Sequence, residues 1–273
     1  FMLNHSLYST FLALALGMLL YSLFKKDFKT SKLTLFISLF FTISISFNIL
    51  IISSRLGYVL LFATIFSMTI IFYGKYLVRA ILSTLIVVTI FYMIAYLNLD
   101  TFKERIHQAK NNIEKIIVKK DFTTSEGIRA GFWFYSLELL NENPFFGTGT
   151  GDHINYVKNK IIESKYYNQE PMLNILEGGT NTGLHADYLD IFVQFGLIGL
   201  LIFLNIFYQI VRYKTENEHL KALQVILVVV MLVQALPQGM VYLAPINKLF
   251  ILLLALTLNL YQNKIDELKI GSR

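Results

Sequence analysis

One histidine, His185, stands where a polar segment meets a long apolar one. It lies near the start of GLHADYLDIFVQFGLIGLLIFLNIFY, residues 183–208, whose second half is apolar enough to enter a bilayer. A neutral imidazole at the boundary between water and membrane is what a general base acting on a lipid-borne substrate needs. The sequence therefore makes His185 a candidate catalytic base. The alternative is a boundary histidine whose ring only reaches water.

The charge of that imidazole depends on the residues beside it. We expect Asn181 or Thr182 to cap the helix that begins in this stretch. Asp187 and Asp190 then fall in its first turns, where acidic side chains suit the positive end of the helix dipole. The dipole favours a neutral His185, whereas the two carboxylates favour a protonated one. Both outcomes stay open in the sequence.

Two arginines are candidate anchors for a phosphate group. Arg55 is the only charge in SSRLG, the short turn between two apolar segments. Arg129 lies in GIRAGFWFYSLELL, one helical turn before Trp133, the only tryptophan. A guanidinium can form two parallel hydrogen bonds to a phosphate. The alternatives are an arginine that reaches the lipid headgroups at position 55, and a solvated arginine on an interfacial helix at position 129.

A glycine-rich loop, NPFFGTGTGDH, follows the helix of Arg129. Its glycines at 147, 149 and 151 can adopt left-handed conformations and expose N–H groups, so the loop can cradle an anion. Its spacing is not that of a dinucleotide-binding loop. A tight turn is the other interpretation. His153, at the end of the loop, is a second candidate base, with a surface histidine as the alternative.

The composition indicates an integral membrane protein. Hydrophobic residues make up 55% of the chain and charged residues 15%, and the mean hydropathy is +0.55. Cysteine is absent, which excludes a disulfide framework and a thiolate metal site. The net charge of +6 is spread over several short loops, so we interpret it as a determinant of membrane orientation and not as a nucleic-acid-binding surface.

Seven apolar segments are near the ~20 residues that a bilayer requires. The sixth is the shortest, and the set is Leu7–Phe24, Leu33–Ser53, Leu56–Tyr73, Leu77–Leu97, Tyr188–Val211, Ala222–Leu236 and Ile246–Tyr261. Lysines and arginines cluster in alternate connections, which is the positive-inside pattern. The first residue and the long connection are therefore expected outside, and the C-terminus in the cytoplasm.

We expect an all-α, polytopic helical bundle with one long, partly helical extracytoplasmic loop. Residues 1–97 would hold four transmembrane helices, including the Arg55 hairpin, 98–187 the loop domain, and 188–273 three further helices and a cytoplasmic tail. Apolar spacing predicts an amphipathic helix from Phe102 to Val118. A second helix should start at a cap among residues 123–125 and end at Asn143-Pro144.

Taken in order, these motifs resemble one family. An arginine in an outer hairpin is followed by an R-x-x-x-W helix, then N-P-F-F-G-T-G-T-G, then H-A-D-Y-L with glycines at 196 and 199 that leads into a membrane helix. This order is similar to that of the O-antigen ligase and polymerase superfamily, and the resemblance covers about Leu33 to Leu204. Members tend to have more spans before the arginine hairpin, so we expect this chain to be the C-terminal portion of a longer protein.

The resemblance implies a membrane glycosyltransferase that moves a glycan from undecaprenyl pyrophosphate to an acceptor such as lipid A core or a glycan. It implies His185 as the catalytic base and Arg55 and Arg129 as residues that face the pyrophosphate. Gly147, Gly149 and Tyr188 are candidate supporting residues. The expected location is the bacterial inner membrane, with the active site on the periplasmic face and the other contacts made to membrane lipids.

The chain departs from the family pattern directly after the histidine. Family members usually have asparagine there, and this chain has Ala186, so Asn181 is a candidate source of the missing amide. The expected chemistry uses no metal or other cofactor, because the sequence has no HExxH motif and no clustered aspartates. Two arginines can stabilise the leaving pyrophosphate instead.

Other functions remain open. Within the superfamily the protein can be a polysaccharide polymerase or a protein O-oligosaccharyltransferase. A metal-dependent oligosaccharyltransferase needs acidic ligands in an outer loop near the first spans, and these are missing. A transporter of the lipid-linked glycan is the non-enzymatic alternative, and it would be expected to carry charged residues within its spans, where this chain has essentially only Asp190.

Overall fold

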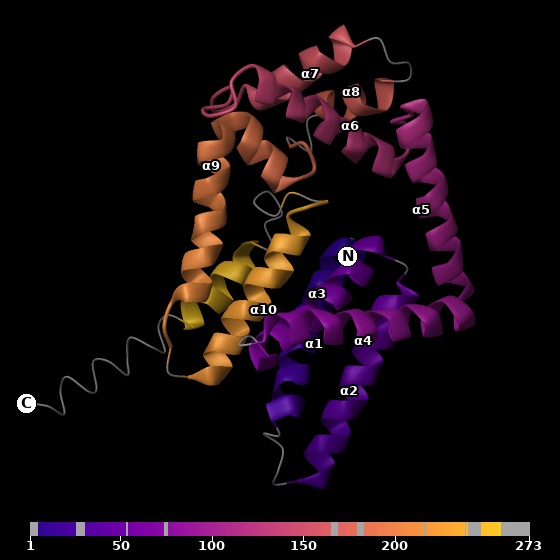
Figure 1. Ribbon diagram of the computed structural model, residues 1–273, viewed down its shortest axis with the longest axis vertical. Coiled ribbons are helices and arrows are strands. Elements are labelled where there is room, and N and C mark those ends of the chain that lie inside the picture. The colour runs from indigo at the N-terminus through magenta and orange to yellow at the C-terminus, as the bar shows by residue number, and fades with distance from the viewer. Residues whose placement is uncertain are drawn as a thin grey trace, which may run out of the picture. The chain divides into compact units, whose positions relative to one another are not determined.

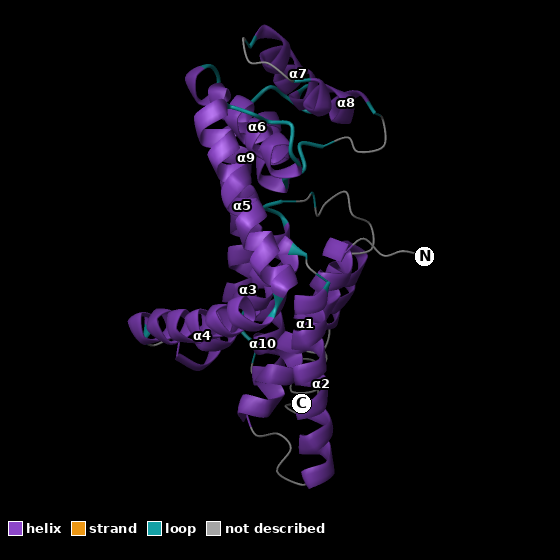
Figure 2. Cartoon of the chain, turned by 90° about the vertical axis from the view of Figure 1, so that its right-hand side faces the viewer, coloured by secondary structure: helices purple, strands orange, loops and turns teal. Residues whose placement is uncertain are grey.

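All regular elements of the described chain are helical. The computed structural model describes residues 5–25, 31–52, 54–73, 76–164, 169–178, 183–215, 217–237, 239 and 247–257. In chain order the elements are α1 (His5–Lys25), α2 (Lys32–Ile51), α3 (Arg55–Tyr73), α4 (Leu77–Asn98), α5 (Asp100–Lys119), α6 (Ser125–Leu137), the 3-10 helix η1 (Glu138–Asn141), α7 (His153–Glu163), α8 (Glu170–Glu177), α9 (Asp187–Arg212) and α10 (Glu218–Gln234) (Figure 1). Within these residues Figure 2 shows helices and loops and no strand. The predicted all-α class is confirmed.

Among the described residues, five helices are long and apolar enough to cross a membrane. They are His5–Lys25, Lys32–Ile51, Arg55–Phe72, Ile81–Asn98 and Asp187–Arg212, and each coincides with one of the predicted spans. The sixth predicted span corresponds to α10, which has 17 residues and is therefore about 26 Å long, shorter than the ~30 Å hydrocarbon layer. Of the seventh, the structure describes a short apolar helix, Asn247–Thr257. Five of the seven predicted spans are thus supported, and the count of seven is not.

The chain forms two compact units, each built from separate segments. The first unit comprises Phe1–Lys103, Gln209–Gln234 and Ala244–Arg273, and the second comprises Glu104–Tyr208 and Ala235–Leu243. The sequence instead predicts a division of the chain at residues 97 and 187, according to the expected membrane topology. That division stays a prediction.

In the first unit, α1, α3 and α10 pack together. Gly17 permits close packing, because a Cβ at this position would lie 2.7 Å from Ile226 Cγ2. Thr10 Oγ1 donates a hydrogen bond of 2.7 Å to Gln234 Oε1, which links α1 to α10 inside the bundle. By contrast, α2 and α4 expose large apolar side chains such as Phe36 and Leu97, as expected of faces that contact lipid.

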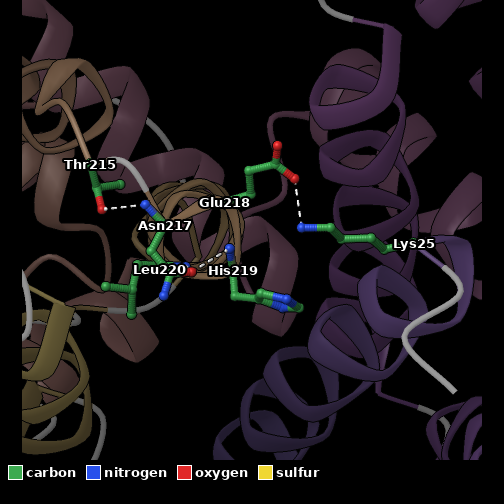
Figure 3. A network of polar contacts seen from close by, with 6 residues as sticks. All are labelled: Lys25, Thr215, Asn217, Glu218, His219 and Leu220. Carbon is green, nitrogen blue, oxygen red and sulfur yellow. Dashed lines mark hydrogen bonds and ion pairs between the residues drawn. The ribbon is translucent and has the colours of Figure 1, made fainter. Parts of the chain in front are cut away.

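A polar network joins the end of α1 to the start of α10. Lys25 Nζ lies 2.5 Å from Glu218 Oε2, and Asn217 Oδ1 accepts hydrogen bonds from the backbone N–H groups of His219 and Leu220 (Figure 3). Asn217 therefore caps α10, since its side chain satisfies N–H groups that have no partner within the helix.

The second unit has its own hydrophobic core. Helices α6 to α8 and the first half of α9 contribute to it, and its members with no exposed surface are Phe132, Tyr135, Val157, Ile161, Met172 and Val193. Gly131 allows α6 and α8 to approach, because a Cβ there would lie 2.4 Å from Met172 Sδ. The predicted helix over 102–118 is confirmed by α5, and Thr124 caps α6 by accepting a hydrogen bond from the Gly127 N–H, as expected. Helices α7 and α8 were not predicted.

Candidate active site

Helix α9 is broken at Gly196, between a half that lies in the core of the second unit and a half that is largely exposed. Gly196 has φ 63° and ψ −161°, a conformation essentially restricted to glycine. A break leaves carbonyl groups at the end of the first half and N–H groups at the start of the second half without helical partners. In a membrane protein such groups must find partners in the protein itself.

The glycine-rich loop supplies those partners. The N–H groups of Thr148 and Gly149 donate to the carbonyl oxygens of Val193 and Gln194, at 2.8 and 2.9 Å. In return, the N–H groups of Leu197 and Ile198 donate to the carbonyl oxygens of residues 144 and 145, at 2.7 and 3.3 Å. The loop thus clamps the helix break. Its N–H groups at 148 and 149 are engaged in this clamp, so they do not form the anion cradle that the glycine spacing suggested.

Two glycines make this close approach possible. A Cβ at Gly147 would lie 2.6 Å from the carbonyl group of Gln194, and a Cβ at Gly196 would lie 2.3 Å from the carbonyl group of Phe145. In both cases the obstructing atoms belong to the backbone, which cannot move aside cheaply. Gly149 and Gly151 also have positive φ, but nothing lies within 4 Å of a Cβ at either position.

These contacts predict a sharp contrast among four alanine variants. Gly149→Ala and Gly151→Ala should cost only the left-handed conformation, about 1–2 kcal/mol or a few °C in melting temperature. Gly147→Ala and Gly196→Ala add a backbone clash, so both should lower the melting temperature well beyond that, or prevent accumulation of folded protein. Thermal unfolding in detergent measures this. Equal shifts for all four variants would contradict the clamp.

His185 lies in the turn that precedes α9. The helix begins at Asp187, so the expectation that Asn181 or Thr182 caps it is wrong, and both of these residues lie outside the described chain. Asp187 and Asp190 fall in the first turn as predicted. His185 has φ 56°, a left-handed conformation that costs a non-glycine residue about 1–2 kcal/mol. Such strain persists only where the surroundings enforce it, and it is common at functional sites.

The surroundings of His185 are well defined. Its neighbours in the chain, Leu184 and Ala186, are buried in the core of the second unit, whereas His185 itself is half-buried. Its ring stacks on Phe132 of α6, with the ring centroids 6.2 Å apart and an angle of 17° between the planes. The imidazole is therefore fixed at the edge of the core.

The pKa of His185 lies below its ordinary value of 6.5. Burial is the largest cause, and the positive charge of Arg129 adds to it, whereas the charge of Asp190 opposes them. The sequence left the competition between a neutral and a charged ring open. In the structure burial and the positive charge of Arg129 favour the neutral form, and the negative charge of Asp190 favours the protonated one.

Arg129 is the cation near His185. It lies half-buried on α6, and its Nε donates a hydrogen bond of 3.1 Å to the carbonyl oxygen of Pro237. Among the described residues no carboxylate forms an ion pair with it. A partly buried guanidinium without an acidic partner is suited to receive an anionic ligand.

Arg55 belongs to the first compact unit, where it is the first residue of α3. Directly before it, Ser54 Oγ accepts a hydrogen bond of 3.3 Å from the Gly57 N–H. Whether Arg55 joins Arg129 and His185 in one site stays a prediction.

An apolar cavity of about 300 Å³ lies in the second unit. Trp133, one turn after Arg129, and Tyr188, three residues after His185, are in its wall, and the rest of the lining consists of Leu137, Leu140, Leu189, Phe192, Leu197, Leu200, Leu204 and Leu236. Tyr188 was expected as a supporting residue, and the structure places it in this wall. A cavity of this size and lining can hold an apolar part of a ligand. Nothing in the sequence motifs pointed to it.

His153 is not the surface histidine that the sequence suggested. Its side chain is only 6% exposed, and its Nε2 lies 3.5 Å from Asp190 Oδ1. The reason is that His153 opens α7, whose Val157 and Ile161 pack in the core and carry the histidine inward.

The fold and this site define a class: all-α membrane proteins in which a strained histidine lies in the turn before a broken helix, with an arginine nearby. Comparison with known proteins gives the family. The chain belongs to the O-antigen ligase family, whose sequence pattern matches residues 37–204.

One relative extends this comparison. An uncharacterized protein of Haemophilus influenzae is 28% identical to this chain over 158 residues, which are 55% of the chain and 38% of the relative. The chain therefore matches less than half of the length of that relative.

Proposed function

We propose that this protein transfers a glycan from undecaprenyl pyrophosphate to an acceptor hydroxyl, as an O-antigen ligase does. The observation that carries the proposal is that two half-buried residues, His185 and Arg129, interact electrostatically. Burial and the positive charge of Arg129 lower the pKa of His185, and Arg129 has no ion-pair partner among the described residues. The apolar cavity behind Trp133 and Tyr188 adds room for the lipid part of such a donor.

In this mechanism His185 accepts the proton of the acceptor hydroxyl. The hydroxyl oxygen forms a bond to the anomeric carbon of the glycan, and the bond from that carbon to the pyrophosphate oxygen breaks. The electron pair leaves with the pyrophosphate, where Arg129 and, as we propose, Arg55 stabilise the developing charge. Direct displacement inverts the configuration at the anomeric carbon. The proposed acceptor is lipid A core. A hydroxyl of a growing repeat unit or of a protein would be activated by the same residues.

The test is a transfer assay with the purified full-length protein in liposomes. We expect the lipid-linked glycan to be consumed, undecaprenyl pyrophosphate to be released and the glycan to appear on the acceptor with inverted configuration. Movement of the intact donor across the bilayer without release of undecaprenyl pyrophosphate would instead identify a transporter and reject the proposal.

The proposal also requires an orientation in which residues 98–187 lie on the periplasmic side of the membrane. Single cysteines at Asn159 and Lys214 test this, because this chain has no cysteine of its own and both positions are exposed. In intact cells a membrane-impermeant thiol reagent should label Asn159→Cys and leave Lys214→Cys unlabelled until the membrane is opened. Equal labelling in intact cells would defeat the orientation.

A further inference from the structure

Asp190 is a buried carboxylate that the transfer chemistry does not use. It lies in the first turn of α9 and is 2% exposed. Its Oδ1 accepts a hydrogen bond of 2.8 Å from the backbone N–H of Leu184, the residue directly before His185. This bond closes the chain from 184 to 190 into a loop with His185 inside it. The carboxylate therefore holds the start of the turn that carries the candidate base.

Gly183 is fitted to the same carboxylate. A Cβ at this position would lie 2.8 Å from Asp190 Oδ2, closer than side-chain atoms normally approach. A residue without a side chain thus allows the segment before His185 to lie against Asp190 without displacing the carboxylate. The close approach and the hydrogen bond are two separate features that fix the segment at the same place.

His153 supports Asp190 from a different helix. It is the first residue of α7, and its Nε2 lies 3.5 Å from the oxygen that accepts the Leu184 N–H. Among the described residues, neither ring nitrogen of His153 has a hydrogen-bond partner. The ring is therefore placed against the carboxylate and is not held by other polar contacts that the structure describes. Its contact with the carboxylate joins α7 to the turn that carries His185.

We propose that Asp190, supported by His153, is the positioning residue that keeps His185 in its left-handed turn with the ring aimed for proton transfer. The inference rests on the proposed function in one respect, namely that His185 is the base. Three features define the position: Asp190 holds the backbone before the histidine, the buried Leu184 and Ala186 hold its flanks, and Phe132 lies against one face of the ring. Of these residues, Asp190 is the one at which a conservative substitution can remove the charge and keep the hydrogen-bond acceptor.

Two substitutions at position 190 separate the hydrogen bond from the charge. Asp190→Asn keeps an oxygen that accepts the Leu184 N–H, so the turn should stay in place. Asp190→Ala removes the acceptor, so the turn should loosen and the ring should move toward water. A 1 Å misplacement of a catalytic group can cost about 10²-fold in rate. We therefore expect Asp190→Ala to lower kcat by about 10- to 100-fold with KM nearly unchanged, whereas Asp190→Asn should stay within a few-fold of the native protein.

The titration of His185 gives a readout that does not depend on activity. The groups that act on it are Arg129 from α6 and Asp190 from α9, and His153 from α7 faces the latter. Asp190→Asn removes the charge that raises the pKa of His185 while the ring stays buried, so the pKa should fall. Asp190→Ala also exposes the ring and thereby removes the largest cause of the lowered pKa, so the pKa should rise toward its ordinary value. A residue that only stabilised the fold would not shift the pKa in opposite directions.

The experiment is an NMR titration of ¹³C-labelled histidine in the full-length protein, with the His185 signal assigned by its loss in His185→Gln, together with transfer kinetics of the same variants. Asp152→Asn is the matched control, because this exposed carboxylate neighbours His153 in the chain and should change neither readout. Shifts of the His185 pKa in the same direction for both Asp190 variants, or equal losses of kcat, would overturn the inference.

Two further outcomes are decisive. If Asp190→Ala does not fold, Asp190→Asn decides alone, since a raised His185 pKa or a 10-fold loss of kcat in that variant contradicts positioning through the hydrogen bond. If the native protein transfers no glycan, the proposed function fails, and the opposite shifts in the titration still decide whether Asp190 holds the turn.

Discussion

His185→Ala should lower the turnover of the lipid-linked donor by about two to four orders of magnitude, the usual contribution of a general base. The protein should still fold, because His185 is half-buried at the edge of the core and is not one of the core residues. Initial rates of glycan transfer with saturating donor measure the effect. His107→Ala is the control, since His107 is exposed on α5 and should leave turnover unchanged.

The pH profile of the native protein belongs to the same expectation. Only the neutral imidazole accepts a proton, and burial together with Arg129 lowers the pKa of His185 below 6.5. Protonation therefore occurs at lower pH than for a free histidine. Transfer should persist as the pH falls through 6.5 and decline only below it, and this acidic limb should disappear from the residual activity of His185→Ala. If His185→Ala keeps the decline in activity at acidic pH, that decline is due to the titration of another group.

Arg129→Ala should abolish transfer by preventing donor binding. Each hydrogen bond from a guanidinium to a phosphate contributes about 1.5–3 kcal/mol, so the loss of two weakens binding by at least about 10²-fold. Arg129→Lys should restore binding only in part, because an ammonium lacks the planar fork. Binding of the lipid-linked donor to the purified protein measures this directly.

A matched control for Arg129 lies on α5. Arg105 hydrogen-bonds to Gln108 of the same helix through Nη1, at 3.0 Å, so Arg105→Ala removes one positive charge without touching the site. Full donor binding by Arg129→Ala would reduce Arg129 to an interfacial anchor. Arg55→Ala is expected to weaken binding in the same direction, and a native affinity in that variant would remove Arg55 from the pyrophosphate site.

Local signals in the sequence were sufficient for much of the fold. Apolar runs predicted five spans that the helices confirm, and helical spacing together with the cap at Thr124 predicted α5 and α6. Helices α7 and α8 were not predicted because they have only 11 and 8 residues. Their apolar positions are too few to show a clear helical period. The start of α9 was placed too early, since a left-handed residue such as His185 leaves no mark in the amino-acid pattern.

The sequence suggested which residues belong to the candidate site, but not how they are arranged in space. The residue types at His185 and Arg129 suggested their chemistry, and the electrostatic effect of Arg129 on His185 supports their proximity. The clamp between Gly147 and Gly196 depends on a contact between segments 49 positions apart, which periodicity does not reveal. The burial of His153 against Asp190 likewise depends on how α7 packs, so a histidine at the end of a polar loop looked like a surface residue.

The most direct test of the mechanism measures donor binding and turnover on the same preparations of His185→Ala and Arg129→Ala. We predict that His185→Ala binds the lipid-linked donor with nearly native affinity but hardly turns it over, whereas Arg129→Ala fails to bind it. Loss of both binding and turnover in His185→Ala would assign the histidine to substrate binding or folding. Native turnover in that variant would contradict its role as the base.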